Sequence, residues 1–256
     1  MSKYKISTTQ LDILLLIYKL RYLTTTNLAT HRNISHSSAL EILQRLKALG
    51  YLGRKFTKQY RLSHTPARYY LKPLAITYLK EVLPDVEEAI WAPRLRDRDR
   101  SADFIALHIA THAAYLDLRD ALGEQVAIRT KSELAGLEGI ITPKPALFVE
   151  GQPGTEHEKL RLFVELPLEQ HLFIVKKRIR TYIEHYQECQ WEGSVYPVVR
   201  IVRRRESERK KLRAYIAEKM DDAYLDETNL IFEVVETAAQ LPFANPPKPR
   251  ERRKRW

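Results

Sequence analysis

The chain of 256 residues is long enough for one large or two small domains, and its formal charge at pH 7 is +11. The charge is concentrated at the two ends: residues 1–83 hold 14 Lys and Arg against 3 Asp and Glu, residues 245–256 hold 6 against 1, and residues 84–244 hold 23 against 28. One cysteine, Cys189, excludes an intrachain disulfide, and the absence of a signal-type or membrane-spanning apolar run favours a soluble cytoplasmic protein. This charge distribution predicts that nucleic acid binds the N-terminal part, with the tail as a further contact.

The N-terminal part predicts three helices followed by a hairpin. The expected elements are a helix from a cap at Thr8 or Thr9 to about Tyr22, a short helix over Thr26–His31, a polar turn over Arg32–His36, a longer helix over Ser37–Leu49 that Gly50 stops, and strands over Tyr51–Phe56 and Arg68–Leu71 joined by a loop over Thr57–Pro66. This order is typical of a winged helix, with a positioning helix, a recognition helix and a β-hairpin wing. A helix from Pro73 to Leu83 follows, and Pro84 ends it.

The predicted recognition helix combines an apolar stripe with a polar reading surface. Leucines recur every three residues at Leu40, Leu43, Leu46 and Leu49, and we expect them to be buried. Short hydroxyls at a helix N-terminus cap free N–H groups or donate to phosphate, while Gln and Arg reach base edges in the major groove. The candidate DNA-binding residues here are Ser35, His36, Ser37, Ser38, Glu41, Gln44, Arg45 and Lys47.

The predicted wing adds a cationic surface that includes Tyr60. Its candidate DNA-binding residues are Arg54, Lys55, Lys58, Arg61 and His64. A cationic hairpin of this kind contacts the phosphate backbone or enters the minor groove. The alternative interpretation is a small helical domain with an ordinary solvated basic face.

Residues 85–100 predict a linker, because Pro93 interrupts them and charges alternate from Arg94 to Arg100 without an apolar stripe. The amphipathic pattern from Ala102 to Leu122 predicts a helix. His108 and His112 on this helix have metal-ligand spacing, but no third ligand accompanies them. Packed or hydrogen-bonded histidines are therefore the preferred interpretation.

Beyond this helix the chain alternates strand and helix patterns. The predicted strands are Val126–Thr130, Ala146–Glu150, Leu160–Leu166, Val195–Val202 and Leu230–Val235, and the predicted helices span about Glu169–Cys189 and Glu206–Met220. A loop rich in Gly and Pro joins the second and third strands, so we expect a mixed sheet with a leading hairpin and helical crossovers. The basic tail 245–256 is expected to be disordered when free. The predicted class is α+β, with domains over 1–84 and 101–244 and a linker over 85–100.

A series of short runs carries a further resemblance through its order and spacing. The runs are Tyr22–Thr24, Leu43–Leu52 and Tyr69–Pro73 in the N-terminal part, and Ala146–Val149, Phe163–Glu165, Arg178–Tyr182 and Tyr196–Ile216 in the C-terminal part. Together they resemble the replication-relaxation family, winged-helix proteins of plasmids and integrative elements. The resemblance implies a second domain of the restriction-endonuclease type, in which acidic residues on neighbouring strands hold a divalent metal. The corresponding positions here are Pro145, Glu165 and Pro167, which offer a single carboxylate.

We therefore expect no catalysis, metal or cofactor, and expect Glu165 to be a structural carboxylate paired with Lys176, Lys177 or Arg178. The prolines are expected before and after strands rather than inside them. The leading hypothesis is sequence-specific binding of double-stranded DNA, and the resemblance implies a role in replication, mobilisation or transcriptional control of a plasmid or mobile element. Replication or mobilisation proteins and a second copy of the chain are further candidate partners, and no membrane is expected.

Two alternatives from other classes stay open. A metal-dependent nuclease or nickase would need acids such as Glu150, Glu165 and Glu169 to converge. A ligand-responsive transcriptional regulator would need a pocket in the α/β domain, and no motif in the sequence marks one.

Overall fold

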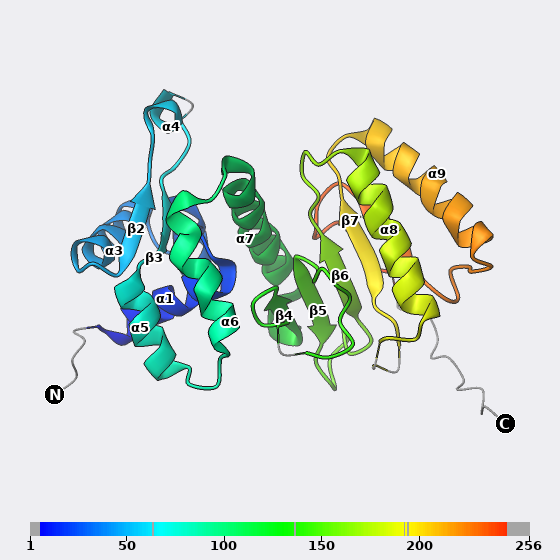
Figure 1. Ribbon diagram of the computed structural model, residues 1–256, viewed down its shortest axis with the longest axis horizontal. Coiled ribbons are helices and arrows are strands. Elements are labelled where there is room, and N and C mark those ends of the chain that lie inside the picture. The colour runs from blue at the N-terminus through cyan, green and yellow to red at the C-terminus, as the bar shows by residue number, and fades with distance from the viewer. Residues whose placement is uncertain (1–5, 63, 136, 192, 194, 245–256) are drawn as a thin grey trace. The chain divides into compact units, whose positions relative to one another are not determined.

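The computed structural model describes residues 6–62, 64–135, 137–191, 193 and 195–244. The chain divides into two compact units, Met1–Leu116 and Asp117–Trp256, and the division falls within helix α7 (Ala102–Leu122). The first unit contains helices and a small antiparallel sheet of three strands, and the second contains a mixed sheet of five strands with flanking helices (Figure 1). The predicted α+β class is confirmed. None of the described helices is long and apolar enough to cross a membrane.

The first unit forms one core around its three-stranded sheet. Before α7 its elements are α1 (Thr8–Leu20), β1 (Leu23–Thr24), α2 (Thr25–Arg32), α3 (His36–Ala48), β2 (Leu52–Lys55), α4 (Lys58–Leu62), β3 (Arg68–Leu71), α5 (Pro73–Val82), α6 (Glu88–Trp91) and the 3₁₀ helix η1 (Ala92–Asp99). The strand order is β1-β3-β2, so the short β1 joins the hairpin that β2 and β3 form. Helices α1 and α3 contribute to the same hydrophobic core.

Short polar residues and glycine set the ends of the first helices. Ser7 caps α1 and forms a capping box with Gln10, one residue before the predicted cap. Asn33 adopts a left-handed conformation (φ 51°) at the end of α2, in the predicted polar turn. Gly50 (φ 83°) ends α3 as predicted, and the N–H of Tyr51 donates to the carbonyl of Leu46 over 3.0 Å.

The buried stripe of α3 differs from the predicted row of leucines. Ala39, Leu43 and Leu46 are fully buried, whereas Leu40 is half-buried and Leu49 is 42 % exposed. A helix has 3.6 residues per turn, so a three-residue repeat drifts around it, and positions nine apart fall on opposite sides. The prediction for Leu49 was therefore wrong, and the spacing of four then three residues from Ala39 marks the buried face.

The hairpin between β2 and β3 contains a short helix where a loop was predicted. Helix α4 lies at the tip of the hairpin (Figure 1). The side chain of Thr57 accepts a hydrogen bond from the N–H of Tyr60 over 3.4 Å, in the manner of a helix cap. Near the base, a Cβ on Gly53 would lie 2.2 Å from the ring of Tyr70, so a larger residue there would have to displace that ring.

The segment predicted to be a linker is folded into the first unit, so that prediction is wrong. Trp91 is 1 % exposed in the core of the unit, and Arg94 and Asp97 are also buried. A 3₁₀ helix has three residues per turn, so these three residues lie on one face while Arg96 and Arg98 are exposed. The search for an apolar α-helical stripe missed this face because two of its members are charged.

Backbone carbonyls satisfy the buried charges of this segment. Arg94 donates to the carbonyls of Tyr18 and Ile90, and Arg21 donates to the carboxylate of Asp97 over 2.7 Å. The hydroxyl of Tyr22 donates to the carbonyl of Asp97, also over 2.7 Å. Polar contacts thus fix this segment to the end of α1.

The second unit follows the predicted order of strands and helices. After the 3₁₀ turn η2 (Gly123–Gln125) come β4 (Val126–Thr130), β5 (Leu147–Gly151), β6 (Arg161–Glu165), α8 (Leu172–Gln187), β7 (Val198–Val202), α9 (Glu206–Asp222) and β8 (Phe232–Val235). The strand order is β4-β5-β6-β7-β8, antiparallel as far as β6 and parallel beyond it, which confirms the mixed sheet, the leading hairpin and the helical crossovers. Pro145 precedes β5 and Pro167 follows β6, as predicted. The predicted disordered tail, residues 245–256, lies outside the described residues.

Candidate nucleic-acid interface

Helix α3 presents a polar face directly opposite its buried stripe. At about 100° per residue, Ser37 and Glu41 lie on the side of α3 that faces away from the core, and Gln44 and Arg45 lie at the two margins of that side. The candidate residues of this helix and the turn before it are all exposed: Ser35, His36, Ser37, Ser38, Glu41, Gln44, Arg45 and Lys47. The helix therefore offers a continuous polar surface to a partner.

The first turn of α3 is held by its own serines. The Oγ of Ser35 accepts from the N–H of Ser38 over 3.1 Å and lies 2.8 Å from the Oγ of Ser38. Ser35 is thus the N-cap of the helix, and its hydroxyl is used inside the protein. Helix geometry leaves the first N–H groups of α3 without partners inside the helix, and they can donate to a phosphate.

A hollow connects α3 with the first strand of the hairpin. It has a volume of about 410 Å³ and is lined by Gln44, Lys47, Ala48 and Arg54. Three of the predicted site residues, from two elements, therefore share one concave surface. Two cations and an amide lining a hollow form a suitable site for an anionic oxygen.

The cations of the hairpin differ in their contacts within the protein and in their exposure. The guanidinium of Arg54 lies 4.6 Å from the ring centroid of Phe56. The ammonium of Lys55 donates to the carbonyl of Arg100 over 2.8 Å, which commits it to the protein. Lys58 and Arg61 on α4 are exposed, as is His64, which follows with a φ of 51°.

The positive charge of this surface is offset by few acids, and Glu41 is the one acid among the candidate residues. The sequence has no acidic residue between Glu41 and Glu81, an interval with nine Lys and Arg. Within the residues that the structure describes, no ion pair involves the cations of α3 or of the exposed hairpin tip. Those cations are Arg45, Lys47, Lys58 and Arg61. Such a surface attracts a polyanion and releases counterions when it binds one.

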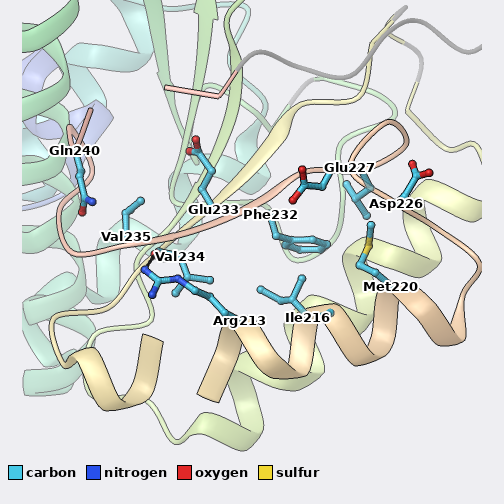
Figure 2. Close-up of a pocket in the computed structure, with 12 residues that line it drawn as sticks. Arg213, Ile216, Met220, Asp226, Glu227, Phe232, Glu233, Val234, Val235 and Gln240 are labelled. Carbon is cyan, nitrogen blue, oxygen red and sulfur yellow. Dashed lines mark hydrogen bonds between the residues drawn. The ribbon is translucent and has the colours of Figure 1, made fainter. Parts of the chain in front are cut away.

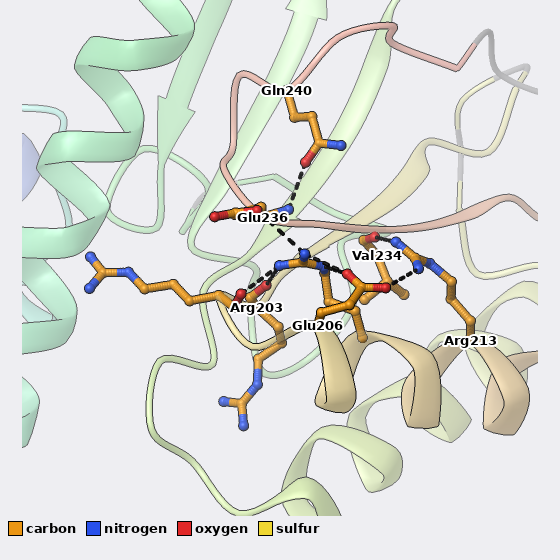
Figure 3. Close-up of polar contacts among 8 residues, drawn as sticks. Arg203, Glu206, Arg213, Val234, Glu236 and Gln240 are labelled. Carbon is orange, nitrogen blue, oxygen red and sulfur yellow. Dashed lines mark hydrogen bonds and ion pairs between the residues drawn. The ribbon is translucent and has the colours of Figure 1, made fainter.

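Many arginines of the second unit, by contrast, are paired with acids. Glu206 accepts from Arg209 over 2.7 Å and from Arg213 over 3.4 Å, and Arg213 also donates to the carbonyl of Val234 (Figure 3). Arg200 is fully buried and pairs with Glu233 over 2.6 Å. Arg213 thus joins α9 to β8 and Arg200 joins β7 to β8, so these arginines are less available to an external anion.

Glu165 is engaged by two side chains inside the second unit. Its Oε1 accepts from the Nε of Arg178 over 2.8 Å and from the hydroxyl of Tyr182 over 2.6 Å. Burial and the neighbouring carboxylate raise the pKa of Tyr182, so the hydroxyl stays protonated and donates. The prediction that Glu165 pairs with one of three nearby cations is confirmed for Arg178.

The acids named for a nuclease do not converge around this carboxylate. Glu150 is paired in register with Arg161, at the opposite end of the β5–β6 hairpin from Glu165. Its carboxylate forms ion pairs with Arg129 over 2.6 Å and with Arg161 over 3.1 Å. Among the described residues, no group of three or more His, Cys, Asp and Glu could hold a metal ion.

The two histidines of α7 pack against aromatic rings, in agreement with the preferred interpretation. The ring of His108 lies 4.6 Å from Phe104 and 6.0 Å from Tyr22, measured between centroids. His112 is fully buried, and its ring lies 6.0 Å from that of His31 on α2.

A second hollow, in the second unit, was not marked by any sequence motif. It has a volume of about 630 Å³, and its lining comes from α9, the following loop and β8. Figure 2 shows the side chains of Ile216, Met220 and Phe232 close together in its lining, with Asp226 and Glu227 beside them at one end. The lining polar groups Arg213 and Glu233 are bonded within the protein, to the carbonyl of Val234 and to Arg200. The hollow therefore has a mixed lining, with apolar side chains from α9 and β8 beside charged ones.

Comparisons with known proteins add no relative. No protein-family model matches the chain, and neither the curated proteins nor the solved structures give a match.

Proposed function

We propose that the first unit is a winged helix-turn-helix domain that binds double-stranded DNA in a sequence-specific manner. Helix α3 is the recognition helix and the β2–β3 hairpin is the wing. The order of α1, β1, α2, α3, β2 and β3, with the strands arranged β1-β3-β2, supports this assignment. The observation that carries the proposal is the hollow that Gln44 shares with Lys47 and Arg54, on a surface whose positive charge is offset by few acids.

The arrangement separates groups that read bases from groups that bind phosphate. With α3 in the major groove, Gln44 offers a donor and an acceptor that match the exposed edge of adenine. Lys47 and Arg54, at the side of the helix that continues into the wing, are placed to neutralise the neighbouring phosphates. Contacts with the DNA phosphates can therefore fix the position of the protein along the duplex, while Gln44 recognises a base.

Glu41 provides a separate reason to propose sequence specificity. A carboxylate on a DNA-facing surface repels phosphates and lowers non-specific affinity. The same carboxylate can accept a hydrogen bond from the amino group of cytosine in the major groove. An exposed acid in the middle of the polar face of α3 thus favours discrimination between bases over general affinity.

We further propose that the second unit does not cut DNA and acts as a scaffold for dimerisation or for a replication or mobilisation protein. The engagement of Glu165 by Arg178 and Tyr182 supports this. The restriction-endonuclease-type fold and the plasmid or mobile-element setting, in replication, mobilisation or transcriptional control, rest on the family resemblance described above.

The decisive experiment is selection of bound duplexes from a random pool with the full chain. We expect one enriched sequence for the wild type and a loss of enrichment for Gln44→Ala. A matched control is Lys210→Ala combined with Lys211→Ala, which removes two exposed cations from α9 in the second unit and leaves α3 intact. Binding without any enriched sequence would overturn sequence specificity, and no binding to any duplex would overturn the whole proposal.

A further inference from the structure

The tip of the hairpin exposes large apolar side chains among cations. Leu62, the last residue of α4, is 82 % exposed, and Phe56 is 42 % exposed. Lys58 and Arg61 are exposed on the same short helix. A leucine almost fully in water at the end of a projecting segment gives no stability to the fold, so a role in binding accounts for it better.

Contacts among aromatic rings and guanidinium groups hold this tip together. Arg54 of β2 lies 4.6 Å from the ring of Phe56, which meets the ring of Tyr60 edge to face at 6.5 Å. Arg68 of β3 lies over Tyr60 at 4.2 Å. The four side chains thus connect β2 to β3 through α4. A tip held in this way presents Leu62 in a fixed position and loses little conformational entropy when it binds.

We propose that Leu62 is an apolar wedge that enters the minor groove, inserts between two base pairs and bends the bound duplex. This inference rests on the proposed DNA binding of the first unit. Leucine is among the side chains that separate stacked base pairs from the minor groove. Lys58 and Arg61 precede the wedge on the same short helix, are exposed, and can contact neighbouring phosphates.

The charge of the hairpin favours DNA over a protein as the partner that binds this tip. The absence of acids from residue 42 to residue 80 makes the partner of the hairpin a polyanion. On duplex DNA the apolar surface available to a leucine is the base stack, which a projecting tip reaches through a groove. A second copy of this basic hairpin would meet it with charge of the same sign.

The test measures affinity and bending on one labelled duplex, with fluorophores at its two ends. The duplex is the selected site, or random-sequence DNA where selection enriches none. Leu62→Ser should weaken binding roughly tenfold or more, because a buried leucine side chain is lost. It should also return the end-to-end energy transfer to the value of free DNA. The slope of log K against log salt should stay unchanged, because no phosphate contact is removed.

Two further variants make the result specific. Leu62→Met keeps an apolar wedge and should retain both the affinity and the bend. Leu95→Ser replaces another exposed leucine of the first unit, 55 % exposed on η1, and should behave as wild type. Unchanged affinity and bending in Leu62→Ser overturn the wedge while leaving DNA binding intact. A change in the sedimenting mass of free Leu62→Ser, without a change in bending, assigns Leu62 to a contact between copies and also overturns it. Failure of the wild type to bind any duplex overturns the proposed function itself.

Discussion

Gln44 on α3 and Arg54 on β2, ten residues apart in the sequence, line the same hollow of about 410 Å³. The turn at Gly50 produces this proximity, because it ends α3 and directs the chain into β2. A side chain able to read a base therefore lies beside one able to hold a phosphate. In the proposed DNA complex, contact with the phosphate backbone and recognition of the base would therefore be linked in one interface.

Gln44 and Arg45 should have different effects on binding, although they are neighbours in the sequence. Gln44→Ala should weaken binding to the selected site by about 1 to 3 kcal/mol and leave binding to a scrambled duplex unchanged, because a base contact is lost. Arg45 lies at the opposite margin of the polar face from Gln44 and does not line the hollow, so it should act on phosphates and affect both duplexes when changed to Ala. Fluorescence anisotropy titrations with the two duplexes measure the difference. Equal losses on both duplexes for Gln44→Ala would make it a backbone contact.

The cations of the wing should differ in their effect on the salt dependence of binding, according to their contacts within the protein. Neutralising Lys58 and Arg61 should flatten the slope of log K against log salt by roughly 0.9 for each lost phosphate contact. Lys55→Ala should leave the slope unchanged, because the ammonium of Lys55 is bonded to the carbonyl of Arg100. Titrations across a range of salt concentrations give the three slopes. A slope unaffected by Lys58 and Arg61 would exclude the hairpin tip from the interface.

Much of the local geometry of the candidate interface could be predicted from the sequence because it depends on local signals. Gly50 marks the end of α3, and the candidate residues of α3 are exposed because the helical period places them away from the core. The hollow could not be predicted, because it depends on how β2 passes the end of α3. The helix at the hairpin tip was missed because five residues between polar loops give no periodic pattern.

The segment over residues 88–99 shows a different reason for failure. Its inward face repeats every three residues and includes Arg94 and Asp97, so a search for apolar residues at the α-helical period finds no stripe. The partners that satisfy these charges, Tyr18 and Arg21, lie about 76 residues earlier. Only tertiary contacts make this segment part of the core.

Replacing Arg94 should destabilise the first unit. Arg94→Met keeps much of the apolar stem but removes the donors to the carbonyls of Tyr18 and Ile90, leaving both without their partner. We expect a loss of about 2 to 3 kcal/mol in the free energy of unfolding. Arg96→Met, on the exposed side of the same 3₁₀ helix, is the matched control and should change stability by less than about 0.5 kcal/mol. Urea titrations followed by fluorescence measure both, and equal effects would show that η1 does not fix the unit.

His185 should make the second unit less stable in acid. The side chain is buried, and its Nδ1 lies 3.0 Å from the hydroxyl of Tyr196. Burial lowers the pKa of His185 below its usual value of 6.5, so in acid the unfolded chain binds a proton that the folded chain resists. Stability is then fully present above pH 6.5 and is lost as the pH falls through the lower, folded pKa.

His185→Gln should therefore reduce the difference between urea midpoints at pH 8 and pH 5. His171→Gln, a change of an exposed histidine before α8, is the control and should leave that difference as in wild type. The imidazole signals in NMR spectra recorded across this pH range give the pKa directly. A His185 pKa above 6.5 would contradict the prediction.

Glu165 should matter for stability and not for cleavage. Its carboxylate holds Arg178 and Tyr182, and Glu165→Gln leaves the partly buried guanidinium without its counter-charge, so we expect a loss of about 2 kcal/mol or more. Glu169→Gln removes an exposed carboxylate four residues along and should cost little stability.

Supercoiled plasmid incubated with Mg²⁺ or Mn²⁺ should stay intact with wild type and both variants, because one engaged carboxylate cannot fix a metal ion against a phosphate. Nicking by the wild type that disappears in a folded Glu165→Gln variant would make this unit a nuclease. Nicking that persists in the variant would point to a different site or to a contaminating enzyme.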